Sequence, residues 1–141
     1  MTLKEIQEEI IEEFSVFDEW MDKYEFLIEL GSDLPTIDAK YKNNEYLING
    51  CQSKVWLNAE LIDEKVQFTA DSDAIITKGI VALLVRVLSN RTPEEIMNAD
   101  LFFIDNIGLA DNLSPTRSNG LVAMVKQMKM YGMAFNAKQN K

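Results

Sequence analysis

The sequence predicts a mixed fold in which helices flank three consecutive β-strands. Residues 45–49, 54–61 and 65–69 are short runs rich in β-forming residues, and such a succession is typical of an antiparallel meander. Apolar residues at helical spacing come before this segment, over residues 1–31, and follow it from residue 74 onward. With 141 residues, 47% of them hydrophobic, the chain can bury one core, so we expect a single domain over residues 1–141.

Two helices are expected before the strands. Thr2 and Glu5 fit a capping box, and the apolar residues that follow recur at helical spacing, with glutamates on the opposite face. Asp18 is predicted to cap the second helix. Gly31, shortly before Pro35, is predicted to end that helix as a left-handed residue.

A central helix is predicted after the strands. Asp71, Ser72 and Asp73 offer N-cap oxygens and negative charge for a helix over residues 74–89. This helix is apolar nearly all round, which favours a buried position. Gly79 in its middle lowers helix propensity and therefore suggests the close approach of another backbone.

The sequence of the C-terminal third predicts short helices followed by one long helix. Thr92, Pro93 and Glu95 form a complete helix start, with a cap, a proline at the first position and a glutamate at the third. Residues 101–108 read as a short helix that ends at glycine. Residues 113–120 are predicted to be a polar loop that opens the last helix.

The formal net charge of −9 argues against nucleic acid as a partner, since nucleic-acid binding needs a basic surface. The imbalance is local: residues 1–33 carry eleven acidic and two basic residues, and the remainder is balanced. These acidic helices have two interpretations, a solvated face or a docking surface for a basic patch.

No membrane association is expected, because the longest apolar run, residues 79–88, is about half the length of a membrane span. The N-terminus does not resemble a secretory signal. Together with a single cysteine, this predicts a reducing, cytoplasmic setting.

Cys51 is the only cysteine of the chain, and the Gly-Cys-Gln-Ser break at residues 50–53 places it between two predicted strands. One sulfur cannot form a disulfide within the chain or a cysteine-only metal site. The sequence contains no histidine, so a Cys-His nucleophile is excluded as well. Cys51 is then either a small buried hydrophobic residue or a sulfur or acyl carrier, a redox sensor or one ligand of a shared site.

Two other positions are candidates for chemistry. Asp71 and Asp73 are either paired carboxylates or ordinary helix caps. Arg117 lies at the N-terminal end of a predicted helix, where a cation does not stabilise the helix. It is either a surface arginine or, with free backbone N–H groups, part of a site for an anion such as a thiolate or persulfide.

Residues 50–57, Gly-Cys-Gln-Ser-Lys-Val-Trp-Leu, resemble the signature of the SufE family, the sulfur-acceptor proteins of iron–sulfur cluster assembly. Residues 113–121, Leu-Ser-Pro-Thr-Arg-Ser-Asn-Gly-Leu, are similar to the family's C-terminal motif. Shorter matches lie at residues 24–35, 71–79 and 92–96, in the family's order. The resemblance covers about residues 20 to 130.

The resemblance implies an α+β fold like that of the IscU scaffold, with a three-stranded antiparallel sheet packed against several helices. It implies that the Cys51 thiolate accepts persulfide sulfur from a SufS-type cysteine desulfurase, stimulates that enzyme and passes the sulfur to a SufBCD-type scaffold. The protein is then an accessory carrier without cofactor or metal, as a monomer or weak homodimer. Arg117, Gln52 and Ser53 are candidates for stabilising the sulfur anion, and Asp73 for holding the cysteine loop or the helix.

Three alternatives belong to other classes. A cluster scaffold is disfavoured, since the chain lacks the additional cysteine and histidine ligands. A thiol peroxidase is disfavoured because no resolving cysteine is present. The main alternative is a non-covalent activator or interaction protein of a desulfurase, in which Cys51 is structural.

Overall fold

The structure, a computed structural model, describes residues 1–35 and 37–139. Its elements in chain order are α1 (Leu3–Ser15), α2 (Trp20–Ser32), the 3₁₀ turns η1 (Ala39–Tyr41) and η2 (Asn44–Tyr46), β1 (Val55–Ile62), β2 (Lys65–Ser72), α3 (Ile75–Leu88), α4 (Pro93–Met97), α5 (Phe103–Asn106), α6 (Leu109–Asn112) and α7 (Pro115–Gln139).

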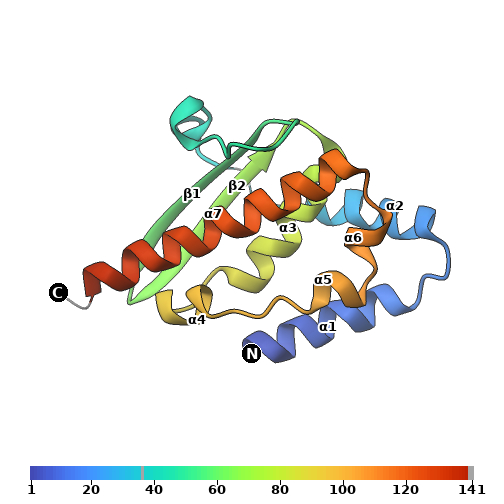
Figure 1. Ribbon diagram of the computed structural model, residues 1–141, viewed down its shortest axis with the longest axis horizontal. Coiled ribbons are helices and arrows are strands. Elements are labelled where there is room, and N and C mark those ends of the chain that lie inside the picture. The colour runs from blue at the N-terminus through green and yellow to red at the C-terminus, as the bar shows by residue number, and fades with distance from the viewer. Residues whose placement is uncertain (36, 140–141) are drawn as a thin grey trace.

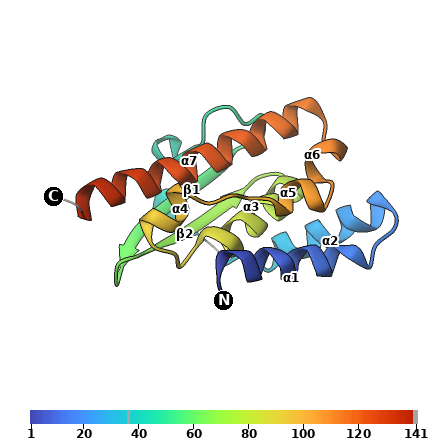
Figure 2. The same ribbon diagram turned by 60° about the horizontal axis from the view of Figure 1, so that its bottom comes forward.

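The predicted central helix is α3, which contacts α1, α2, β2 and α7 (Figure 1). Its apolar side chains point in nearly every direction around the helix axis, so several of its faces must be covered. In Figure 2 the hairpin and α3 lie in the middle, with α7 on one side of them and α1 and α2 on the other side. No helix formed by residues 1–35 and 37–139 is long and apolar enough to span a membrane.

The two strands form an antiparallel hairpin in which Val55 pairs with Ser72 and Ile62 with Lys65. The connecting residues Asp63 and Glu64 both have positive φ, of 52° and 67°, as a two-residue type I′ turn requires. The predicted turn at these two residues is therefore confirmed. Alternate residues of β2 are buried, so one face of the hairpin lies on the core.

The prediction of a first strand over residues 45–49 is wrong: the described residues form a two-stranded sheet. The Asn43 side chain accepts a hydrogen bond from the backbone of Glu45 and caps the 3₁₀ turn η2 instead. The backbone of residues 47–48 then forms one bridge to β1, between Leu47 and Trp56, and the bond from Ile48 N to Val55 O, 2.9 Å. The α+β class is nevertheless correct.

Both predicted capping boxes are confirmed. Thr2 with Glu5 starts α1, and Thr92 with Glu95 starts α4; in each pair the hydroxyl oxygen accepts from the glutamate N–H and the carboxylate from the threonine N–H. The two hydrogen bonds of each box are reciprocal, so each box satisfies two backbone donors that the helix itself leaves unpaired.

Three predicted helix ends are wrong. The N-cap of α2 is Glu19, not Asp18, and it makes no side-chain cap bond. Gly31 does not end α2 as a left-handed residue, because the helix continues through Ser32. The last helix begins at Pro115, so most of the loop predicted over residues 113–120 is helical.

Candidate functional site

Cys51 lies in the loop between Leu47, which forms the bridge to Trp56, and the start of β1 at Val55. The preceding residue, Gly50, has φ +96°, a conformation that side-chain-bearing residues rarely adopt. A Cβ atom at Gly50 would also lie 3.2 Å from the Cβ of Ala123 on α7. The glycine therefore lets the loop turn sharply against α7 and brings Cys51 to that helix.

The C-terminal end of this loop is held by the last residue of β2 and the residue after it. The Asp73 carboxylate accepts from the Lys54 N–H at 3.0 Å, and the Asp73 N–H donates to the Lys54 carbonyl at 3.2 Å. The Ser72 hydroxyl donates to the same carbonyl at 2.9 Å. Asp73 does not cap α3: the N-cap is Ala74, whose N–H donates to the Ser72 hydroxyl oxygen at 3.3 Å.

The thiol of Cys51 is half-buried and donates a hydrogen bond to the carbonyl oxygen of Gly120, with a distance of 3.6 Å between sulfur and oxygen. Burial raises the pKa of the Cys51 thiol above its ordinary value. A carbonyl acceptor also favours the protonated group, which alone can donate. In this conformation Cys51 is thus held as a neutral thiol.

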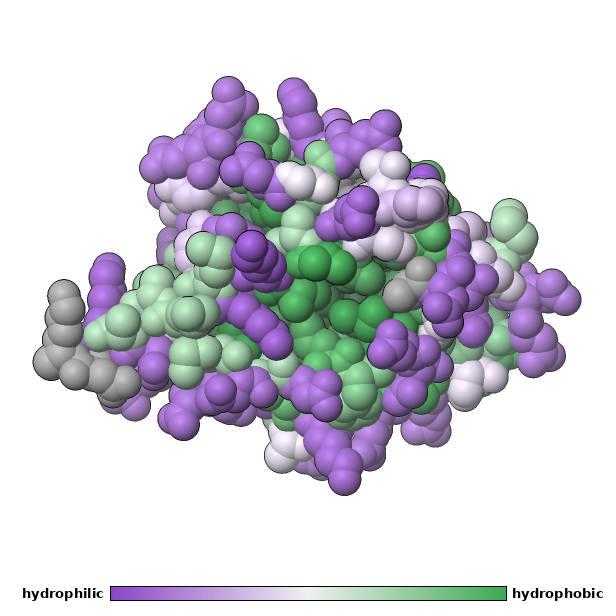
Figure 3. Space-filling model, in the orientation of Figure 1, coloured by the Kyte–Doolittle hydropathy of each residue, from purple (hydrophilic) through white to green (hydrophobic). Residues whose placement is uncertain are grey.

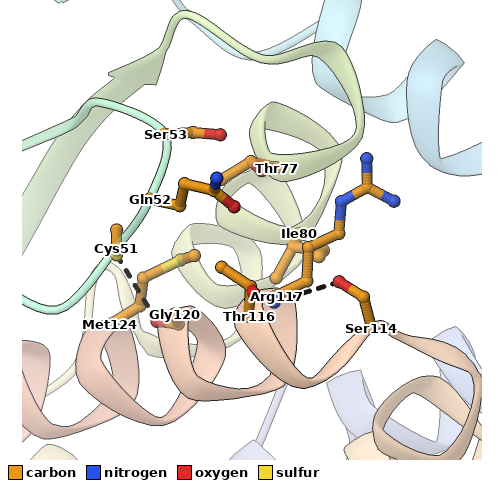
Figure 4. A pocket seen from close by; sticks show the side chains of 10 residues that line it. All are labelled: Cys51, Gln52, Ser53, Thr77, Ile80, Ser114, Thr116, Arg117, Gly120 and Met124. Atoms are coloured by element: carbon orange, nitrogen blue, oxygen red, sulfur yellow. Dashed lines mark hydrogen bonds between the residues drawn. The ribbon is translucent and has the colours of Figure 1, made fainter.

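A cavity of about 310 Å³ opens beside Cys51 (Figure 4). It is lined by the loop, by α3 and by the first turns of α7: Cys51, Gln52, Ser53, Thr77, Ile80, Ser114, Thr116, Arg117, Gly120 and Met124. Ile80 and Met124 are buried and give the cavity an apolar wall. A water molecule takes up about 30 Å³ of liquid, so the cavity has room for an atom the size of a second sulfur next to the thiol.

Arg117 lies in the first turn of α7 and is one of the residues that line this cavity. Its N–H donates to the Ser114 hydroxyl oxygen at 3.3 Å, so that serine caps the helix start. In Figure 4 the exposed guanidinium extends away from Cys51. The structure therefore brings four of the five candidate residues to one cavity: Cys51, Gln52, Ser53 and Arg117.

The paired-carboxylate interpretation of Asp71 and Asp73 does not fit the geometry. Asp71 forms ion pairs with Lys42 at 3.0 Å and with Lys78 at 3.4 Å, whereas Asp73 holds the cysteine loop. Among the residues that the structure describes, no group of three or more Cys, Asp or Glu side chains could hold a metal ion.

Gly120 and Met124 complete the site and were not expected to do so. A Cβ atom at Gly120 would be 3.6 Å from the Cys51 sulfur, an ordinary contact distance, so this turn of α7 lies directly against the cysteine loop. The sequence signal available was the spacing of Arg117, Gly120 and Met124, which become neighbouring positions on one helical face only if the helix starts at Pro115.

A family model described as SufE: Fe-S metabolism associated domain matches residues 8–132, most of the chain. The chain belongs to the SufE family. It therefore has a role in iron–sulfur metabolism, and the resemblance drawn from residues 50–57 and 113–121 is confirmed at the level of the family.

Relatives in bacteria and a plant agree with SufE membership. An uncharacterized SufE-like protein of Rhizobium meliloti (strain 1021) is 36% identical over 127 residues, which cover 86% of this chain and 91% of the relative. One from Rhizobium etli is 39% identical, with 86% of each chain covered. SufE-like protein 1 of Arabidopsis thaliana, chloroplastic/mitochondrial, is 39% identical over 132 residues, or 93% of this chain and 36% of the plant protein.

The SufE-type fold also has a solved counterpart. The solution structure of a hypothetical protein from Thermus thermophilus superposes with a TM-score of 0.75 and covers 92% of this chain and 94% of its own. The two sequences are 19% identical, so this likeness concerns the fold alone.

Proposed function

We propose that this SufE-family chain is a sulfur acceptor for iron–sulfur cluster assembly, with Cys51 as the residue that carries the sulfur. In this proposal a SufS-type cysteine desulfurase supplies the sulfur and a SufBCD-type scaffold receives it. The protein is an accessory factor of the desulfurase in the cytoplasm, with no cofactor of its own.

The observation that carries the proposal is the setting of Cys51. It is the only thiol of the sequence, and it lies on a loop anchored at Lys54 beside a cavity with room for one more sulfur atom. A loop supported by a rigid scaffold is a common position for a residue that must reach a partner. A cavity with an apolar wall would limit the access of water and reductants to a loaded sulfur.

The reaction is a thiol–persulfide exchange. The Cys51 thiol first leaves the Gly120 carbonyl and loses its proton to solvent or to the partner. The thiolate then attacks the terminal sulfur of the desulfurase persulfide, so that a new S–S bond forms on Cys51 as the old S–S bond breaks. The desulfurase cysteine leaves as a thiolate and can react again, which accounts for stimulation of turnover.

The neighbouring residues have distinct roles in this scheme. Arg117 lines the cavity, and rotation of its exposed side chain toward Cys51 would stabilise the thiolate or the persulfide anion. Gln52 and Ser53 offer further donors on the same wall. Asp73 is a positioning residue, because it acts on the loop through Lys54 and does not line the cavity.

Desulfurase turnover with free cysteine tests the proposal, measured without the protein, with wild type and with Cys51→Ser. We expect stimulation by wild type only, together with a mass increase of one sulfur atom on Cys51. A second variant, Cys51→Ser with Val16→Cys, places the thiol on an exposed position at the end of α1. It should not restore stimulation if the loop and cavity matter.

The non-covalent activator remains the second candidate, because Cys51 is half-buried and hydrogen-bonded as a structural cysteine would be. Equal stimulation by wild type and Cys51→Ser, with no added sulfur, would establish that role instead. The absence of both stimulation and added sulfur would overturn both candidates.

A further inference from the structure

An apolar groove lies along a face of α7 whose residues do not line the Cys51 cavity. It has a volume of about 760 Å³ and runs between α7 and α5. Figure 3 shows it as a hydrophobic hollow near the centre of the face, bordered by hydrophilic side chains. Its floor includes Ile104 of α5 and Leu121 and Val125 of α7.

The α7 side of the groove exposes large apolar side chains that the core does not use. Val122, Met130 and Met133 are 67%, 49% and 55% exposed. Methionine side chains are flexible and are common where a surface must pack against another molecule. A contiguous apolar patch with a polar border is typical of an interaction site.

The charge around the groove specifies what can fill it. Helix α7 carries four basic residues and no acidic residue, although the whole chain has a net charge of −9. Two of the four, Lys126 and Lys129, line the groove, and Asp105 lies on the α5 side. A ligand would therefore match the groove in shape and charge if it had an apolar ridge and carried acidic residues on the side that faces α7.

A second copy of this chain does not meet these requirements. Two α7 helices related by a two-fold axis would bring lysines toward lysines, with no carboxylate on either helix to pair with them. The acidic helix α1 offers glutamates, but its apolar residues Ile6, Ile10 and Phe14 are buried in the core. A flat anionic membrane would leave a concave groove empty.

We infer that this groove is the docking site for an amphipathic helix of a partner protein, with an apolar stripe flanked by Asp or Glu. The mode is that of a helix laid in a groove with apolar anchors at helical spacing. A neighbouring hollow of about 380 Å³ shares Val122, Lys126 and Met130 with the groove and extends to Asn49, beside the cysteine loop. A bound helix would thus place its protein close to Cys51, although docking itself does not require the thiol.

The test uses the full-length protein and three fluorescent peptides of about 18 residues, long enough to span the groove. The first is helical, with leucines at helical spacing and flanking glutamates; the second has lysines in place of those glutamates; the third is a scrambled form of the first. Binding is measured by anisotropy for wild type and for the groove variants Met133→Asp and Lys126→Glu. Lys129 is left intact because it donates to the Ala99 carbonyl at 2.7 Å.

Matched controls make the same changes elsewhere on the surface. Met21→Asp alters a methionine of α2 that is 68% exposed, and Lys65→Glu alters an exposed lysine at the hairpin turn. Circular dichroism and thermal unfolding of every variant establish that the fold is kept.

We expect the acidic peptide to bind wild type at least about tenfold more tightly than the other two peptides, and each groove variant to weaken that binding about tenfold. The two controls should change it less than about twofold, and added salt should weaken it. Equal binding of the three peptides, or groove variants that bind like wild type, would overturn the inference. Failure of the acidic peptide to bind would overturn it in favour of a second copy if Met133→Asp abolished a homodimer seen by sedimentation. The same failure would overturn it in favour of a membrane if Met133→Asp abolished binding to phosphatidylserine vesicles.

Discussion

Gly31 of α2 and Gly79 of α3 lie in direct contact where these two helices cross. A Cβ atom at Gly31 would be 2.8 Å from the backbone nitrogen of Gly79, and one at Gly79 would overlap the carbonyl oxygen of Leu27. The missing side chains let the two backbones touch, which confirms the close approach expected at Gly79. This contact fixes α2 against the helix whose first turns line the Cys51 cavity.

Gly79→Ala should therefore destabilise the protein, although alanine is the better helix former. Separating the two helices to admit a methyl group should cost about 3 kcal/mol or more, against a propensity gain of about 1 kcal/mol. Unfolding in urea measures the difference. Gly120→Ala is the matched control, since its Cβ would make only ordinary contacts with Cys51, and its stability should equal or exceed that of wild type. Equal effects of the two changes would show that the helices can separate freely.

The features that the sequence predicted correctly are those set by neighbouring residues. The capping box of Thr2 and Glu5 and the turn at Asp63 and Glu64 depend on hydrogen bonds and dihedral angles within a few residues. The SufE resemblance also located Cys51 and Arg117 in motifs that the fold brings to one cavity, although they are far apart in the chain.

The features that it missed depend either on competing local conformations or on distant residues. Residues 45–49 have the composition of a strand, but the capped turn at Asn43 and the left-handed Gly50 leave room for one bridge only. Asp73 was a candidate for holding either the cysteine loop or the helix, and the choice depended on its partner Lys54, 19 residues away. The apolar groove depends on how α5 meets α7, which no local pattern specifies.

Asp73→Ala should make Cys51 more reactive toward a disulfide reagent such as dithionitrobenzoate. The change removes the acceptor for the Lys54 N–H, and the loss of one such bond is worth about 1 kcal/mol, or about fivefold in the opening of the loop. Because the chain has one cysteine, the reaction rate reports that loop directly. Asp73→Asn keeps the accepting oxygen and should react like wild type. If Asp73→Ala also reacts like wild type, this bond does not hold the loop.

The pH dependence of Cys51 alkylation should differ between the folded and the unfolded chain. Burial raises the pKa of the folded thiol, so the rate of iodoacetamide alkylation should reach its midpoint at a higher pH in buffer than in concentrated urea. A midpoint at the same or a lower pH in the folded protein would mean that a nearby cation already stabilises the thiolate.

The raised pKa of the Cys51 thiol also predicts how this residue affects the stability of the protein in alkali. A thiol whose pKa is raised by folding stabilises the folded state fully below its unfolded pKa, about 8.5, and this contribution is lost as the pH rises through the folded pKa. Wild type should lose more stability than Cys51→Ser between about pH 8 and 10. Tyr131, whose pKa burial also raises, is present in both proteins, so the comparison between them isolates the thiol. Parallel curves would contradict the prediction.

Acid should weaken the attachment of α1 to α3 through Arg86. This guanidinium donates to both carboxylate oxygens of Glu13, at 2.8 and 2.6 Å, and to Glu9 at 2.6 Å. The hydrogen bonds from Arg86 hold the pKa of Glu13 below its usual value. A carboxylate of lowered pKa stabilises the folded state above its unfolded pKa, about 4.3, and this stability is lost as the pH falls through the folded pKa.

Glu13→Gln should accordingly lower the free energy of unfolding by about 1–2 kcal/mol at pH 7, because Glu13 is only 32% exposed and binds Arg86 through both oxygens. The difference from wild type should shrink as the pH is lowered below about 4, where wild type also loses the charge. Urea unfolding at a series of pH values measures both effects. Glu12→Gln removes the same charge from the exposed face of α1, and it should change stability by less than about 0.5 kcal/mol throughout. If both substitutions follow the same curve, the effect comes from the net charge of the acidic helices and not from the contact with Arg86.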